Sequence, residues 1–87
     1  MLGRNVWAGG NEVDLIVRRG RAIVFVEVKR KRGEGFGDPL EMVGSEKLRR
    51  VRRAAEAWLA AHPEAEGLEP SFEVAAVRGR RVERVAV

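Results

Sequence analysis

The chain has 87 residues and a net charge of +4, from 17 basic and 13 acidic side chains. Its length supports one domain, residues 1–87, with one modest core, and 45% hydrophobic with 34% charged residues excludes a disordered chain. Because it has no cysteine and one histidine, it excludes disulfides, thiolate zinc sites and multi-histidine centres, so a bound metal would need the oxygen ligands that suit Mg²⁺ or Mn²⁺.

The basic excess is mostly arginine, whose planar guanidinium suits phosphate, so DNA is a candidate partner. On charge alone, a DNA-binding surface and an ordinary surface that binds no nucleic acid are equally supported. No apolar run approaches the roughly 18 residues of a membrane span, and the first residues lack a signal peptide's hydrophobic run. We therefore expect a cytoplasmic protein without a membrane partner.

The first third of the chain predicts a short extended segment and a β-hairpin. Residues 5–8 are extended, and Gly9-Gly10-Asn11 forms a turn into a strand over residues 12–18. Alternation in that strand puts three apolar residues on one face (Val13, Leu15, Val17) and three others opposite (Glu12, Asp14, Ile16). A tight connection at residues 18–21 leads to an antiparallel strand over residues 22–29, with one face apolar (Val24, Val26, Val28) and the other mixed (Phe25, Glu27, Lys29).

The rest of the chain predicts one helix and a second hairpin. Residues 30–43 are polar and glycine-rich and indicate a loop, after which Ser45 is a candidate N-cap of a helix to about Ala61. Helical spacing gives that helix one apolar face (Leu48, Val51, Ala55, Trp58, Leu59). His62-Pro63 ends it, with His62 on the terminal carbonyls, and an acidic connector over residues 63–70 precedes strands at 72–77 and 81–87. We predict an α/β fold in which one helix covers one sheet face.

Four charged residues on the first hairpin are the candidate site. If their sides of the strands lie on one face, Glu12, Asp14, Glu27 and Lys29 form a cluster. Crowded carboxylates repel one another unless a cation lies between them, and Mg²⁺ suits that position and phosphodiester hydrolysis. Lys29 would orient the attacking water or neutralise phosphate charge. A Glu-x-Lys tripeptide alone is typical of ordinary strands, but the apolar neighbours on both strands favour the functional interpretation.

Five segments together resemble the YraN-like endonuclease family: NVW at 5–7, EVDLI at 12–16, VFVEVK at 24–29, FGDPLEMV at 36–43 with Lys47, and FEVAAV at 72–77. That family is part of the PD-(D/E)xK superfamily and is similar to Holliday junction resolvases. The resemblance implies a restriction-endonuclease-like core with a mixed central sheet and a main flanking helix. It implies metal ligation by Asp14 and Glu27, a catalytic Lys29, and an acidic residue of lesser rank at Glu12.

One departure from the family pattern concerns the N-terminus. Family chains begin with a helix that carries a further glutamate, whereas this chain starts almost on the first strand. We therefore expect a sheet face that exposes apolar residues (Val13, Leu15, Val24 or Val26), which would favour a homodimer through that face.

Basic residues next to the site are candidates for nucleic-acid contact: Arg30, Lys31 and Arg32 after the second strand, and Lys47, Arg49 and Arg53 on the helix. For the helix, an ion-paired solvated face is the alternative, with Glu46 beside Arg50. Trp7 is left open between core and exposed contact. The leading hypothesis is a metal-dependent endonuclease acting on branched or structured DNA. The alternatives are a nucleic-acid-binding module without catalysis and a dimeric structural domain whose strand charges pair with one another.

Overall fold

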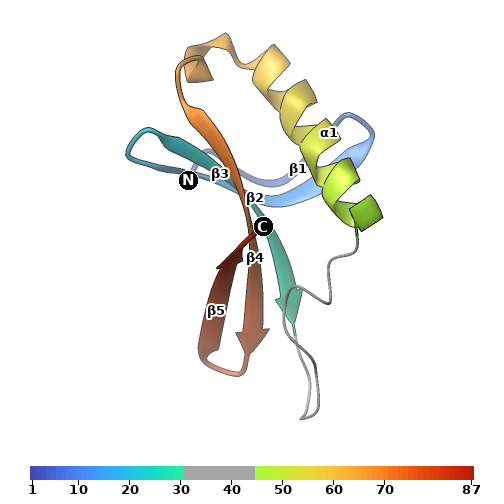
Figure 1. Ribbon diagram of the computed structural model, residues 1–87, viewed down its shortest axis with the longest axis vertical. Coiled ribbons are helices and arrows are strands. Elements are labelled where there is room, and N and C mark those ends of the chain that lie inside the picture. Colours follow the sequence, from blue (N-terminus) through green and yellow to red (C-terminus); the bar gives the residue numbers. More distant parts are fainter. Residues whose placement is uncertain (31–44) are drawn as a thin grey trace.

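The computed structural model describes residues 1–30 and 45–87, and Figure 1 shows one helix lying across a twisted sheet. The elements are β1 (Gly3–Ala8), β2 (Asn11–Arg19), β3 (Ala22–Arg30), α1 (Ser45–Ala61), the 3-10 turn η2 (Pro63–Ala65), β4 (Glu69–Arg78) and β5 (Arg81–Ala86). The strands lie in the order β1-β2-β3-β4-β5, with β3 and β4 parallel and every other pair antiparallel. The predicted α/β fold with a mixed sheet and one flanking helix is confirmed. The loop was predicted over residues 30–43. Arg30 is the last residue of β3, and the rest of the predicted loop lies outside the described residues.

Helix α1 covers one sheet face through its apolar stripe. Phe25 of β3 is fully buried there, with its ring edge-on to Trp58 of α1 and stacked on Phe72 of β4, at centroid distances of 6.1 and 5.8 Å. The predicted ends of α1 are confirmed, and the side chain of Ser45, the expected N-cap, lies outside the described part. His62 Nδ1 lies 2.7 Å from the carbonyl oxygen of Trp58, which confirms its predicted place on the terminal carbonyls.

The β1–β2 turn fixes how close α1 comes to the sheet. Gly9 has a φ of +58°, and a side chain there would meet the backbone oxygen of Arg53 at 3.0 Å and the Ala57 methyl at 3.3 Å. Glycine is therefore needed both for the turn and for the close approach of the helix. The described helices are all too short or too polar to span a lipid bilayer.

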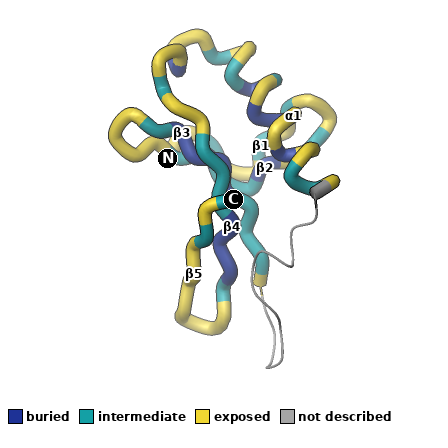
Figure 2. Tube along the Cα trace, in the orientation of Figure 1, coloured by how far each residue is buried: buried dark blue, intermediate teal, exposed yellow. Residues whose placement is uncertain are grey.

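The face of the sheet opposite α1 carries a second apolar cluster, formed by Val24, Val26 and Ala75 with partly buried neighbours (Leu15, Val17, Ala22, Val28). We expected exposure here, but Val24 and Val26 are only 2% and 4% exposed. An ion pair between Arg19 of β2 and Glu73 of β4 crosses β3 on this face, and the register places it over Val24. Figure 2 shows the buried central strands between exposed turns. The expected exposure was therefore wrong for Val24 and Val26, and the homodimer stays a prediction.

The alternation predicted for β2 fails at one position. Val13 was expected on the face of Leu15 and Val17, and exposed, but it is 1% exposed and lies with Ile16 in the core beneath α1. The cause is an irregularity at Asp14, which is unpaired in the described registers of β1–β2 and β2–β3. A strand that leaves its ladder for one residue changes which face the next side chains occupy.

The start of β4 also differs from expectation. β4 starts at Glu69 rather than at residue 72, so part of the expected connector is strand. Pro70 is tolerated because β5 pairs with β4 only from Glu73 onward, which leaves Pro70 with β3 as its single neighbour and no hydrogen bond to donate on the other side. Trp7 is 71% exposed, which resolves it as a surface residue.

Candidate metal and nucleic-acid site

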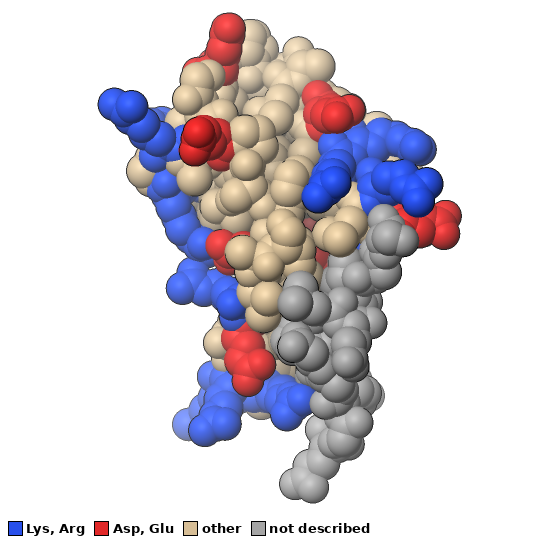
Figure 3. Space-filling model, in the orientation of Figure 1, with Lys and Arg blue, Asp and Glu red and all other residues tan. Residues whose placement is uncertain are grey.

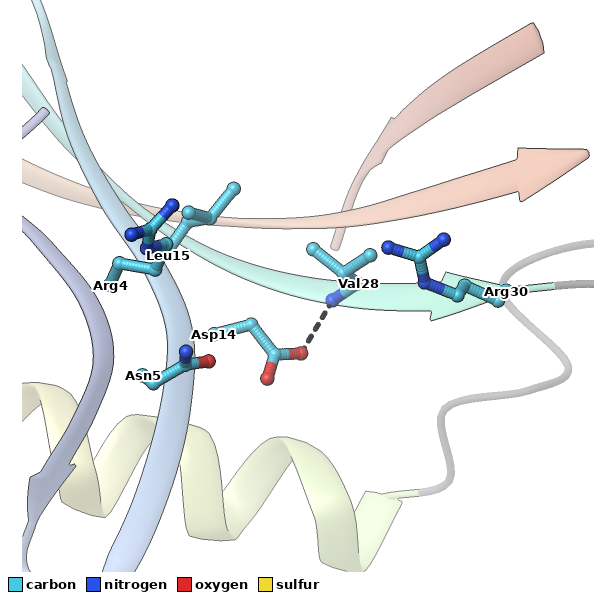
Figure 4. A pocket seen from close by; sticks show the side chains of 6 residues that line it. All are labelled: Arg4, Asn5, Asp14, Leu15, Val28 and Arg30. Carbon is cyan, nitrogen blue, oxygen red and sulfur yellow. Dashed lines mark hydrogen bonds between the residues drawn. The ribbon is translucent and has the colours of Figure 1, made fainter. Parts of the chain in front are cut away.

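Strands β2 and β3 separate at Asp14, and this fork creates the site. Their regular pairing ends at Leu15 and Val26. Beyond that point the backbone N–H of Val28 donates a hydrogen bond to Asp14 Oδ2 at 2.8 Å, so a side-chain carboxylate takes the place of a main-chain acceptor (Figure 4). Because the bond fixes one carboxylate oxygen, it orients Asp14 while leaving its other oxygen available for a ligand.

The fork opens into a pocket on the α1 side, of about 340 Å³, that we call the lysine pocket; it is lined by Asn11, Glu12, Asp14, Glu27, Lys47, Arg50 and Val51. Asp14 and Glu27 come from different strands and line the same pocket. Glu12 is exposed at its rim. Of the four residues expected to cluster, Glu12, Asp14 and Glu27 line this pocket, and Lys29 does not line it but lies next to Glu27.

Two lysines bind one oxygen of Glu27. Lys47 Nζ of α1 lies 2.6 Å from Glu27 Oε1, and Lys29 Nζ lies 3.5 Å from the same atom. The Glu27 side chain is 13% exposed, so this pairing is partly desolvated and stronger than a surface ion pair. Glu27 is therefore held in position by a residue of its own strand and by a residue of the covering helix.

The two ammonium groups have opposite pKa shifts. A hydrogen bond with Lys47 lowers the pKa of Lys29, and burial and the charge of Lys47 lower it further, against the opposing charge of Glu27. Burial opposes the charged form of Lys47, but hydrogen bonds to Glu27 and Lys29, with the charges of Glu27 and Asp14, raise the pKa of Lys47. Lys29 is thus the first of the pair to lose its proton as the pH rises.

The donor set fits a hard divalent cation. Asp14 and Glu27 offer carboxylate oxygens, and Mg²⁺ in proteins is commonly held by one or two carboxylates, with water and substrate phosphate completing its shell. In the described ranges, no three acidic or histidine side chains lie close enough together to hold a metal ion. Asp14 and Glu27 stay the predicted metal ligands, and Glu12 stays a candidate of lesser rank.

The predicted nucleic-acid contacts divide into three groups. Arg30 ends β3 and is exposed near the fork, and Arg49 and Arg53 are exposed on α1, whereas Lys31 and Arg32 lie outside the described residues. Near α1, a group of blue basic side chains has red acidic ones beside it (Figure 3), and Arg50 pairs with Glu46 at 3.3 Å. The ion-paired helix face that we set against phosphate contact is therefore present at Arg50. A second basic group lies at the β4–β5 turn.

Sequence reasoning missed part of the site. Lys47 was predicted as a phosphate contact, but it binds Glu27 inside the lysine pocket. Asn11 and Val51 also line that pocket and were not anticipated. The position of Lys47 could have been inferred from its spacing to Val51. Lys47 lies one helical turn before Val51, which is part of the core, so both side chains lie over the same face of the sheet.

Comparison with known proteins gives one family. The model of "Uncharacterised protein family UPF0102" matches residues 1–86. A UPF0102 protein of Syntrophotalea carbinolica is 42% identical over 80 residues, which are 92% of this chain and 64% of that protein. One of Methylorubrum extorquens is 45% identical over 80 residues, 92% of this chain and 61% of that protein. The chain thus spans somewhat less than two thirds of the length of these relatives.

Proposed function

Because this chain belongs to the UPF0102 family, we propose that it is a metal-dependent DNA endonuclease of the PD-(D/E)xK type that acts on branched or otherwise structured DNA. One observation carries the proposal. Asp14 of β2 and Glu27 of β3 line the same pocket where the two strands separate, and Lys29 forms an ion pair with Glu27. The proposal includes a restriction-endonuclease-like core. It is supported by the mixed sheet, whose β2–β3 hairpin carries Asp14, Glu27 and Lys29.

Each residue has a separate task in this mechanism. Asp14 and Glu27 would hold Mg²⁺ or Mn²⁺ through carboxylate oxygens, and the Val28 N–H keeps Asp14 oriented. A cation bound there would polarise a phosphate oxygen and favour ionisation of the attacking water. Lys29, which lies beside Glu27, would orient that water at Nζ or neutralise charge that develops on the phosphate. Lys47 fixes the carboxylate of Glu27.

The alternative is a DNA-binding module with the same fold and no cleavage. One observation favours it: Lys47 Nζ already lies on the Glu27 oxygen that a cation would need, at 2.6 Å. In that case the ammonium acts as the permanent counter-ion of Glu27, and the basic surface alone holds DNA.

The two are separated by a cleavage assay with the 87-residue chain on a four-way junction and on a linear duplex, with Mg²⁺ or Mn²⁺. We expect metal-dependent cleavage of the junction, abolished in Glu27→Gln and Lys29→Ala with DNA binding retained. Glu66→Gln is the matched control, because Glu66 is exposed beyond η2 and outside the site. A wild type that binds the junction but cuts neither DNA with either metal would support the binding module instead.

A further inference from the structure

Asp14 lines a second pocket on the face of the sheet opposite α1. This pocket, of about 380 Å³, which we call the arginine pocket, is lined by Arg4, Asn5, Asp14, Leu15, Val28 and Arg30 (Figure 4). Leu15 and Val28 are part of the apolar cluster away from α1, whereas Lys47, Arg50 and Val51 of α1 line the lysine pocket. Asp14, at the point where the strands part, therefore lines pockets on both sides of the sheet.

The backbone of β1 is distorted where it passes this carboxylate. Asn5 has a φ of +52°, in the left-handed region, and the β1–β2 ladder skips the Asn5–Asp14 pair while it continues on both sides. Asparagine adopts this conformation more readily than other non-glycine residues, and non-glycine residues held in it are found preferentially at ligand sites. Figure 4 shows the Asn5 amide beside Asp14 on the same side of β2.

The charge of the arginine pocket is complementary to a phosphate. Arg4 from β1 and Arg30 from β3 flank Asp14 of β2, and both are exposed. Within the part of the chain that the structure describes, neither forms an ion pair with a carboxylate. Guanidinium groups bind phosphate oxygens through paired, charge-assisted hydrogen bonds. Asp14 by itself would repel a phosphate, so the pocket suits an anion only while a cation neutralises Asp14.

We propose that the arginine pocket is the subsite for a backbone phosphate of DNA, held by Arg4, Asn5 and Arg30 next to the cation on Asp14. The inference rests on the proposed function and deepens it, because it assigns substrate contacts to Arg4 and Asn5. The two guanidinium groups bind the phosphate oxygens, and the Asn5 amide donates to one of them. The subsite therefore works only in the metal-loaded state.

This dependence gives a direct test by fluorescence anisotropy of a labelled four-way junction, measured in Ca²⁺, which occupies oxygen sites, and in EDTA. We expect Arg4→Ala and Arg30→Ala to weaken binding about tenfold in Ca²⁺, the size of a lost charge-assisted hydrogen bond. In EDTA these two variants should lose no more binding affinity than Arg21→Ala. Arg21 is an exposed arginine in the β2–β3 turn, at the other end of the strands. Asn5→Gly should weaken binding in Ca²⁺ as well, without misfolding, because glycine adopts a positive φ readily.

The outcomes separate the two proposals. If Ca²⁺ strengthens wild-type binding and Arg4→Ala keeps the whole gain, the phosphate subsite is refuted and the metal centre stands. If Ca²⁺ gives the wild type no gain over EDTA, the metal centre and the subsite both fail. A loss in Arg4→Ala that is equal in Ca²⁺ and EDTA would refute the subsite too, because it would reduce Arg4 to a general surface charge.

Discussion

Strands β2 and β3 differ at their two ends. From Leu15 to Arg19 and from Ala22 to Val26 they pair in regular register, and Phe25 is buried against Trp58 and Phe72. One residue beyond that register, at Asp14 and Glu27, the pairing stops and charged side chains line two pockets. The same two strands therefore supply both the core and the candidate site.

A small domain can accommodate an unfavourable cluster of charge where main-chain pairing is interrupted. The paired end buries aromatic and branched side chains and stabilises the fold. At the forked end the main-chain pairing is interrupted at Asp14, and the Val28 N–H donates to the Asp14 carboxylate instead of to a main-chain carbonyl. Substitutions at the paired end should change stability first, and substitutions at the fork should change ligand binding first.

The largest expected effect is at the paired end. Phe25→Ala removes a fully buried ring that contacts two aromatic neighbours, and such truncations cost about 3–5 kcal/mol of unfolding free energy. Urea denaturation followed by tryptophan fluorescence would measure it. Val82→Ala, at an exposed position of β5, is the control and should change stability by about 0.5 kcal/mol or less. Equal midpoints for the two variants would contradict the assignment of the core.

A smaller effect on stability is expected at the fork. Asp14→Ala removes the acceptor of the Val28 N–H and should cost about 1–3 kcal/mol, whereas Asp14→Asn keeps an oxygen there and should cost less. Both should lose cation affinity, because both lose the carboxylate charge. Urea denaturation and calorimetric titration with Mn²⁺ measure the two effects. If Asp14→Asn were as unstable as Asp14→Ala, the hydrogen bond would not be what holds the fork.

The smallest effect is on the titration of the two lysines, measured by NMR at their ε-carbons. We expect the pKa of Lys29 below the ordinary lysine value and the pKa of Lys47 above it. The signs for stability are opposite. Because the pKa of Lys47 is raised, Lys47 contributes stability that is fully present below the ordinary lysine pKa and is lost as the pH rises through the folded-state pKa. Because the pKa of Lys29 is lowered, protonated Lys29 destabilises the fold at pH values below its folded-state pKa. That destabilisation disappears as Lys29 loses its proton at higher pH.

Two variants sharpen this titration. Lys47→Gln should raise the pKa of Lys29 toward the ordinary value, since Lys47 is the main cause of its shift. Glu27→Gln should lower the pKa of Lys47, because Glu27 supplies the leading favourable hydrogen bond and charge. An unchanged Lys29 titration in Lys47→Gln would mean that the two lysines do not interact in solution.

Much of the paired end could be predicted from the sequence, because local patterns determine it. The hairpins, the ends of α1 and the shared face of Phe25, Glu27 and Lys29 follow from periodicity, turn residues and proline. The fork could not be predicted in this way. Val13 changes face because Asn5 takes a positive φ and Asp14 leaves the ladder, and both depend on neighbouring strands.

The placement of α1 was also beyond local patterns. The sequence predicts which face of α1 is apolar, but not which strand residues lie under its first turn. The contact between Lys47 and Glu27 therefore appears only in three dimensions. The ion pair on the face of Val24 likewise joins Arg19 and Glu73, residues 54 positions apart in the chain.

Mn²⁺ broadening of backbone amide signals shows whether the carboxylates of Asp14 and Glu27 together bind one divalent cation. We expect substoichiometric Mn²⁺ to broaden the amide signals of Asp14, Glu27 and Val28 before others, and Glu27→Gln to abolish this selectivity. Broadening that instead begins at the exposed acidic residues Glu64 and Glu66, or that is unchanged in Glu27→Gln, would contradict it.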